Sequence, residues 1–286
     1  MKLDPPREPL DLLVVGGLTI DRLTDDSLAP GGSVIHIARA GAAAGVRLGV
    51  VTAAGPEPEA TQALAELRRL ATVVDSTPGA ATIRYRHVES QDGRRLWLEH
   101  KGPMVTVPAG ASSTLQAAAI LFTPVAGEIG TDLLATLPAR SRGAILQGWL
   151  RTIDEGESRT VPLASLRPAL VEKLAGMALL TASREDLRGE GGEPAAQLLA
   201  LRGWIGPAPL LVVTDGVEGA WVDDGSGPQH LPVPRRVDGV PSIGAGDVFA
   251  AFTLLALTAQ DISPRAAAVS GMRAVIEMLE ARVGEC

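Results

Sequence analysis

A glycine-rich turn that ends in an aspartate is the part of this sequence best suited to chemistry. Residues 244–247 read Gly-Ala-Gly-Asp and lead into an apolar run over 248–257. The first turn of a helix leaves backbone N–H groups without partners at its electropositive end, so this turn predicts an anion site. A carboxylate there repels the anion. This cost is explained if Asp247 is a general base for a hydroxyl that attacks a phosphoryl group. An aspartate that only caps the helix is the competing interpretation.

Alternating apolar segments must position this turn. The sequence predicts strands at 11–17, 47–53, 72–76, 118–123, 143–147, 177–181 and 209–213. It predicts helices at 33–45, 59–70, 130–136, 164–174, 194–203, 246–259 and 264–281. This alternation is typical of an α/β fold whose parallel sheet is covered on both faces. Residues 81–100 and 219–233 each read as a hairpin, and the first is a candidate lid over an active site.

The composition excludes several classes of partner. The chain has 286 residues, enough for one large α/β domain with a lid, and its formal net charge of −7 argues against a nucleic-acid partner. We find no apolar signal core and no run long enough to span a membrane, which predicts a soluble, cytoplasmic protein without membrane contact. The single cysteine, Cys286, excludes an internal disulfide, and the four histidines lack metal-ligand spacing.

Several short motifs follow one another in a fixed order along the chain. An opening strand, Asp21 and a Gly-Gly pair at 31–32 come first, Thr-Asp-Gly at 214–216 comes later, and Gly-Ala-Gly-Asp at 244–247 comes last. Taken in this order, the motifs resemble those of the PfkB (ribokinase-like) family of small-molecule kinases. The resemblance covers nearly the whole chain. It implies a doubly wound, mostly parallel sheet flanked by helices, in one domain over 1–286 with small β lid elements around 18–30 and 81–101.

The resemblance implies catalytic roles for the glycine turn. Asp247 matches the family's base, which takes the proton from the acceptor hydroxyl. The amides of Gly244, Ala245 and Gly246 match the anion hole for the transferred phosphoryl group, where fixed donors stabilise the charge on the transferring oxygens.

It also implies two binding regions. Asp21 matches an acidic residue that holds acceptor hydroxyls, and Gly31 and Gly32 match paired glycines against which the acceptor lies. Thr214 and Gly216 match a segment that lines the nucleotide site. Each pattern has a local alternative, because the same residues could form turns or caps without binding anything.

Three positions depart from the family pattern. His36 stands where the family usually has asparagine, so an imidazole would contact the acceptor. The magnesium-linked Asn-x-x-Glu appears only as Ser183 to Asp186, with Glu185 as the alternative in a shifted register. We therefore assign Ser183 to the cofactor site and Asp186 to the metal, although an N-cap explains the same residues. Pro-Ser-Ile at 241–243 replaces a common Asp-Thr-Thr, which puts monovalent-cation activation in doubt.

A further likeness concerns the acceptor. Pro-Val-Ala-Gly-Glu at 124–128, Gln-Gly-Trp-Leu-Arg at 147–151 and Asp-Gly-Arg-Arg at 92–95 resemble the branch that includes inositol kinases. Glu128 and Arg151 follow predicted strands, where open α/β sheets bind ligands, so both are expected to contact the acceptor. A surface salt bridge is the competing interpretation.

Together these observations predict an ATP-dependent phosphotransferase that uses magnesium and phosphorylates a hydroxyl of a sugar, an inositol or a related polyol. A nucleoside acceptor is one alternative, which the scarcity of aromatic residues disfavours; Tyr85 and Trp97 are the lid aromatics that could stack on a base. A relative that binds ligands without turnover is another. A NAD-dependent oxidoreductase is a weaker option, because no Gly-x-Gly-x-x-Gly fingerprint is present. The alternating lid hairpin could pair with another lid in a homodimer.

Overall fold

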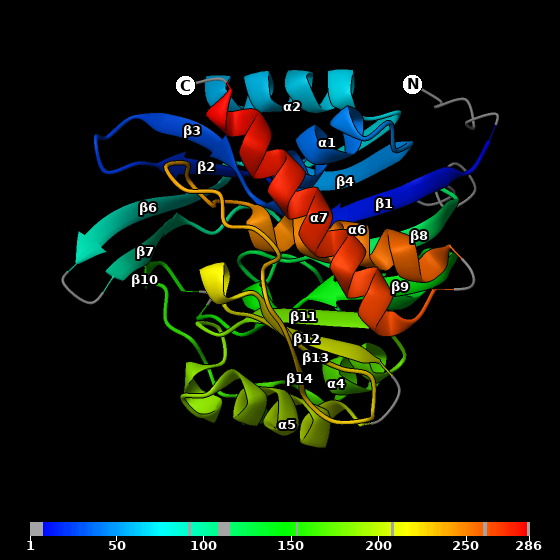
Figure 1. Cartoon of the computed structure of the whole chain (residues 1–286). Coiled ribbons are helices and arrows are strands. Elements are labelled where there is room, and N and C mark those ends of the chain that lie inside the picture. The colour runs from blue at the N-terminus through cyan, green and yellow to red at the C-terminus, as the bar shows by residue number, and fades with distance from the viewer. Residues whose placement is uncertain are drawn as a thin grey trace.

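A nine-stranded sheet runs through the centre of the molecule (Figure 1). The computed structural model describes residues 8–90, 93–107, 115–152, 154–206, 209–259 and 262–284, without the side chains of 89, 90, 93 and 94. Asp92 and Cys286 lie outside the described residues. The strand order is β14 (Gln229–Leu231), β13 (Ala220–Asp223), β12 (Leu210–Thr214), β11 (Leu179–Ser183), β9 (Ala139–Ile145), β8 (Ala117–Thr123), β1 (Leu10–Gly16), β4 (Leu48–Ala54) and β5 (Val73–Pro78).

The pairing within this sheet confirms the predicted α/β architecture. Neighbouring strands from β12 to β5 are parallel, and β13 and β14 add antiparallel pairs at one edge. The interior strand β1 is apolar from Leu12 to Val15 because both of its faces are covered. Leu13 and Val15 belong to one buried core, while Leu12 and Val14 belong to the other.

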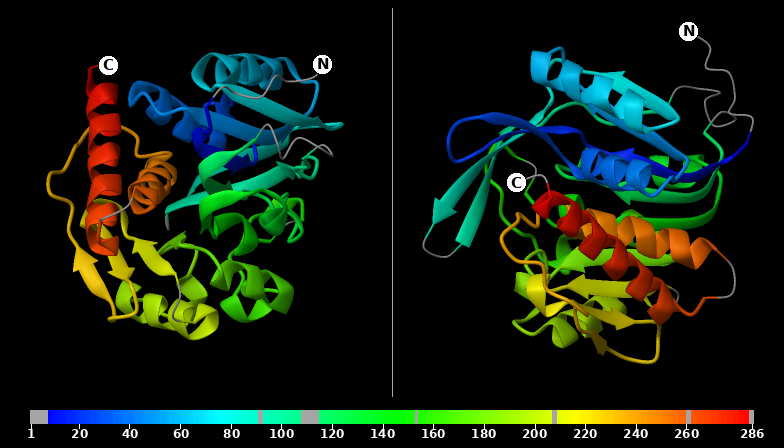
Figure 2. Two further views of the ribbon diagram at one scale, coloured as in Figure 1. Left: turned by 90° about the vertical axis from the view of Figure 1, so that its right-hand side faces the viewer. Right: turned by 45° about the horizontal axis from the view of Figure 1, so that its top comes forward.

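Helices form a layer on each face of the sheet (Figure 2). One core contains side chains of α1 (Ser33–Ala43), α2 (Pro58–Leu70), α6 (Ala245–Thr258) and α7 (Pro264–Val283). The other contains side chains of α3 (Leu133–Thr136), α4 (Pro168–Ala175) and α5 (Pro194–Ile205). Among the described residues, no helix is both long and apolar enough to cross a membrane.

A second, five-stranded sheet stands beside the first, in the order β10 (Gly156–Glu157), β7 (Gly93–His100), β6 (Ile83–Ser90), β2 (Thr19–Arg22) and β3 (Leu28–Gly31). The hairpin predicted at 81–100 is formed by β6 and β7, which project from the body in Figure 1. Strand alternation turns Tyr85 and His87 toward the body, whereas Arg86 and Trp97 face outward and stack on each other. We call this second sheet the lid sheet.

The sequence placed some element boundaries wrongly, for local reasons. The helix predicted at 164–174 begins only at Pro168; residues Leu163–Ser165 form a separate 3₁₀ turn, η3. Proline lacks an N–H and favours the first helical position, so the helix starts there. The helix predicted at 130–136 is the single turn α3, and the strand predicted at 143–147 ends at Ile145, before the 3₁₀ turn η2 (Gln147–Trp149).

Candidate active site

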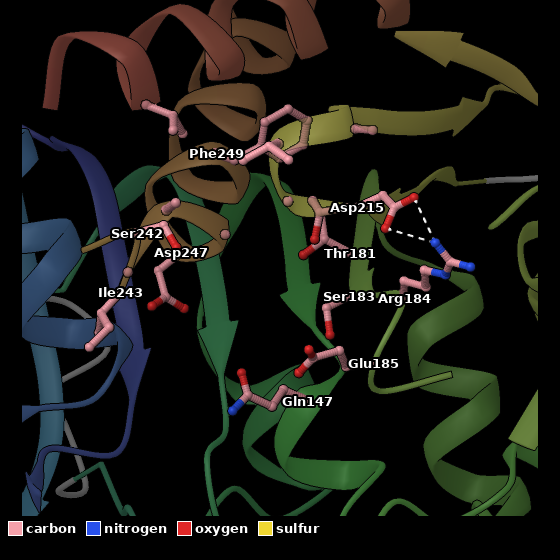
Figure 3. A pocket seen from close by; sticks show the side chains of 18 of the residues that line it. Gln147, Thr181, Ser183, Arg184, Glu185, Asp215, Ser242, Ile243, Asp247 and Phe249 are labelled. Atoms are coloured by element: carbon pink, nitrogen blue, oxygen red, sulfur yellow. Dashed lines mark hydrogen bonds and ion pairs between the residues drawn. The ribbon is translucent and has the colours of Figure 1, made fainter. Parts of the chain in front are cut away.

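A cleft of about 1250 Å³ opens between the lid sheet and the carboxyl ends of the central strands. Its walls come from the ends of β9, β11 and β12, from the start of α6, from one side of α7 and from the inner face of the lid sheet. Ligands of open α/β sheets bind at this edge. Figure 3 shows Asp247 pointing into the cleft from the start of α6, with Gln147, Ser183 and Glu185 across from it.

The glycine turn leaves backbone donors open at the start of α6. Gly244 has a φ of 84°, and a side chain there would collide with the ring of His36. The N–H of Ala245 donates to Ser242 O at 3.0 Å, so this amide already has a partner. Among the described residues, the N–H groups of Gly246 and Asp247 have none, and the space beside the Gly246 Cα is open. The turn can therefore offer these two donors to an anion.

Asp247 has the electrostatics of a base that works near neutral pH. Burial raises the pKa of this carboxyl to about 6, although the hydrogen bond from Ser33 opposes the shift and the charge of Asp186 adds to it. The Ser33 hydroxyl donates to Asp247 Oδ1 at 2.7 Å. Sequence reasoning missed Ser33, although its position directly after the paired glycines, as the first residue of α1, was a usable signal.

Asp21 lies on the lid sheet and has two neighbours that the sequence did not reveal. The Thr19 hydroxyl donates to Asp21 Oδ1 at 2.8 Å, and His87 Nε2 lies 3.4 Å from Asp21 Oδ2. All three side chains line the cleft. Thr19 and Asp21 are on β2 and His87 is on β6, so only the pairing of these strands brings them together.

The two glycines that precede α1 serve the packing around Asp21. A side chain on Gly31 would collide with the Asp21 carboxylate, and one on Gly32 would collide with the carbonyl of Gly17. Gly32 also has a φ of 84°, a conformation that side chains disfavour. Gly32 lines the cleft, whereas Gly31 is not among the lining residues.

His36 lines the cleft next to Gly244. Burial lowers the pKa of its imidazole to about 4, and the charges of Arg39 and Arg282 add to this shift. The ring is therefore neutral at physiological pH, and its Nδ1 has no hydrogen-bond partner among the described residues.

Arg151 and Asp186, which the sequence assigned to different ligands, bind each other. Arg151 donates from Nε and Nη2 to Asp186 Oδ1, at 3.3 and 3.0 Å. Asp186 Oδ2 accepts from the N–H and the hydroxyl of Ser183, at 3.1 and 2.7 Å. Asp186 is 3% exposed, and both of its oxygens have protein donors. Glu185 beside it is exposed and points into the cleft, as Figure 3 shows.

Glu128 is buried and is not among the residues that line the cleft. Its carboxylate accepts the N–H groups of Val125 and Ala126, at 2.8 to 3.1 Å, and burial raises its pKa. The Tyr85 hydroxyl donates to Val125 O at 2.8 Å, so the same loop supports the lid sheet. Glu128 thus binds the backbone of the loop at 125–126 and does not line the cleft.

The far side of the cleft combines polar strand ends with an apolar wall. Ser183, Thr214 and Gly216 line it together, as expected for one binding region. Arg184 and Asp215 form an ion pair at 3.2 Å there (Figure 3). The apolar wall consists of Met272, Val275, Ile276 and Leu279 on α7 and of Phe249 on α6.

The carboxylates of the cleft limit how a metal could bind. Among the described residues, no group of three or more histidine, cysteine, aspartate or glutamate side chains could hold a metal ion. Magnesium usually keeps several waters and binds through one or two carboxylates together with substrate phosphates. Glu185 fits that mode, because it is exposed in the cleft and its ion pair with Arg188 is long at 3.7 Å.

Comparisons with known proteins place the chain among small-molecule kinases. The model of the pfkB family of carbohydrate kinases matches residues 13–271. A cytidine kinase of Thermococcus kodakarensis is 28% identical over 257 residues, which cover 84% of this chain and 86% of that protein.

Solved structures share the fold. A pyrophosphate-dependent kinase in the ribokinase family, complexed with a pyrophosphate analog and myo-inositol, has a TM-score of 0.74 at 17% identity and covers 93% of this chain and 94% of its own. A ribokinase from Cryptococcus neoformans in complex with ADP has a TM-score of 0.67 at 17% identity, over 96% of this chain and 99% of its own.

Proposed function

The chain belongs to the pfkB family of carbohydrate kinases, which are small-molecule kinases, and we propose that it transfers the terminal phosphoryl group of ATP to a hydroxyl of a sugar, an inositol or a related polyol. One observation carries this proposal. A carboxylate with a raised pKa and two open backbone donors meet at the start of α6, inside a cleft that the lid sheet borders. A base beside an anion site is what phosphoryl transfer to an alcohol requires.

The proposed reaction is a direct transfer. The acceptor hydroxyl gives its proton to Asp247, its oxygen bonds to the terminal phosphorus, and the bond from that phosphorus to the bridging oxygen breaks, so that ADP leaves. The N–H groups of Gly246 and Asp247 stabilise the charge on the transferring oxygens. Ser33 holds the Asp247 carboxylate in place through its hydrogen bond.

The acceptor is proposed to bind between the lid sheet and the start of α6. On the lid sheet, Asp21 offers carboxylate oxygens to the substrate hydroxyls and His87 offers a ring nitrogen. His36 and Gln147 line the cleft from the body of the protein. These groups suit hydroxyls, since each can give or take hydrogen bonds with a neutral partner. Arg151 completes this wall while remaining bound to Asp186.

The donor is proposed to lie on the far side, with its base against the apolar wall of α7 and its phosphates directed at α6. Thr214, Gly216 and Ser183 would line its path. Magnesium, when bound, neutralises charge on the donor phosphates, and Glu185 is the residue we assign to it, through water. Asp186 is not proposed as a ligand, because both of its oxygens accept protein donors.

We also propose that the lid sheet closes over the acceptor and excludes water, which would otherwise compete as an acceptor. A homodimer through the outer face of the lid sheet is a secondary proposal. It is supported by exposed apolar side chains on that face, Val88 and Trp97.

A nucleoside acceptor is the second candidate, favoured by the identity with the cytidine kinase. The lid aromatics give it little support. Trp97 lies on the outer face of the lid sheet, and the Tyr85 hydroxyl is already bonded to Val125 O. A polyol is therefore the preferred acceptor class.

The test measures ADP release with ATP and magnesium over a panel of inositols, pentoses, hexoses and nucleosides, and phosphate release where pyrophosphate replaces ATP as the donor. Acceptor-dependent ADP release that disappears in Asp247→Asn supports the kinase. Nucleotide binding without turnover on any acceptor would favour a relative that only binds its ligands.

A further inference from the structure

The segment before the glycine turn is held by an arginine from the other end of the second C-terminal helix. Arg282 lies in the last turn of α7, and its Nη1 donates to Pro241 O at 2.6 Å and to Ile243 O at 3.0 Å. In the right view of Figure 2, the orange segment that precedes α6 approaches the red end of α7. One guanidinium thus binds two carbonyls immediately before the anion site.

The turn itself has little else to fix it. Pro241, Ser242 and Ile243 are exposed, so packing contributes little to their position. Ser242 O accepts the N–H of Ala245, and the next residue, Gly244, is a left-handed glycine on which the segment can pivot. If Arg282 released the carbonyls of Pro241 and Ile243, the described contacts would leave them without donors.

The charge of Arg282 also reaches the site. It is one of two arginines whose positive charge helps to lower the pKa of His36, which lies against Gly244. A positive charge behind the turn favours an anion in front of it. Arg282 therefore acts on the anion site both by geometry and by charge, although it is not among the residues that line the cleft.

We propose that Arg282 is a positioning residue: a cation supplied by the chain itself that holds residues 241–244 so that the N–H groups of Gly246 and Asp247 face the transferred phosphoryl group. This role rests on the proposed kinase function. It predicts that the chemical step, rather than acceptor binding, depends on Arg282.

Arg282→Ala, Arg282→Lys and a matched control, Arg273→Ala, test the proposal. Arg273 lies on the same helix, is exposed, and gives the same change in charge when replaced. Arg282→Ala should lower kcat by about 10²-fold, because a misplaced donor weakens stabilisation of the transition state, and should leave the acceptor KM unchanged. Arg282→Lys should retain a higher kcat than Arg282→Ala. Added guanidinium ion should restore part of the kcat of Arg282→Ala and should not change the kcat of Arg273→Ala.

A second measurement does not depend on turnover. Hydrogen exchange of the Ala245 and Val248 amides, which donate to Ser242 O and Gly244 O, should become faster in Arg282→Ala and stay at the wild-type rate in Arg273→Ala. Wild-type kcat in Arg282→Ala, an equal loss in Arg273→Ala, or unchanged exchange would each overturn the proposed role. A wild-type protein with no turnover on any acceptor would overturn the kinase function instead, while the exchange experiment would still decide whether Arg282 holds the turn.

Discussion

Replacing the proposed base should make the protein more stable while it destroys activity. In the folded protein, burial raises the Asp247 pKa from 3.8 to about 6. A carboxyl with a raised folded pKa stabilises the fold fully below its unfolded pKa, and this contribution is lost as the pH rises through the folded pKa. The shift of about two units corresponds to about 3 kcal/mol lost at high pH, of which about 2 kcal/mol is lost between pH 4.5 and pH 8.

Asp247→Asn removes this titration and keeps the shape of the side chain. The free energy of unfolding of the variant minus that of wild type should therefore be about 2 kcal/mol larger at pH 8 than at pH 4.5, so that the variant gains stability relative to wild type as the pH rises. A carboxylate at the start of a helix gains about 0.3–1 kcal/mol from the helix dipole, which reduces the benefit without reversing it. Turnover at pH 8 should fall by roughly 10²–10⁴-fold.

Urea unfolding at several pH values measures the first effect, and ADP release measures the second. Asp154→Asn is the control, since Asp154 is exposed. Groups that titrate in both wild type and variant contribute equally to the two free energies of unfolding, so their contributions cancel in the difference. A difference that stays flat from pH 4.5 to pH 8 would refute the argument that burial strains this carboxylate, and full turnover in the variant would refute its role as a base.

Four further outcomes are expected. The kcat/KM of wild type should rise with pH through about 6 as Asp247 loses its proton, and Ser33→Ala should move that rise to higher pH because it removes a hydrogen bond that lowers the pKa. Asp186→Ala should lower the free energy of unfolding by about 3 kcal/mol in urea titrations, because it leaves Arg151 partly buried without its carboxylate; unchanged unfolding would contradict this. Glu185→Gln should raise the magnesium concentration for half-maximal turnover, and an unchanged magnesium dependence would exclude it as the ligand. Replacing potassium with choline should not change turnover, since Arg282 already binds the carbonyls before the turn; a requirement for potassium would contradict this.

The parts of the fold that the sequence predicted well depend on local patterns. β1 and β12 are short apolar runs that each end at a glycine-containing turn, and α6 follows its glycine turn directly, so each could be found without knowing its neighbours. The lid sheet was only partly predictable. Its hairpin follows from alternation around a turn, but the addition of Gly156–Glu157 as β10 depends on a pairing about sixty residues away in the sequence.

The site likewise contains residues that belong to local motifs and residues that are brought together only by the fold. The glycine turn and Asp247 form one local motif and could be found from it. His87 contacts Asp21 only because β6 pairs with β2, and Ser33 contacts Asp247 across 214 positions of sequence. No pattern within a short window reports such contacts, so these two residues were missed.

A sequence motif also cannot tell which acidic side chains the fold has already used. In the cleft, Asp186 forms an ion pair with Arg151, and Asp215 forms one with Arg184. Asp247 differs, because among the described residues the hydrogen bond to its carboxylate comes from a neutral hydroxyl, that of Ser33. Burial without a cation is what raises its pKa toward neutrality, and a base must sit near the working pH to accept a proton and release it again. The burial of Asp247 therefore supports its proposed role as the base on electrostatic grounds that are independent of the motif that first pointed to it.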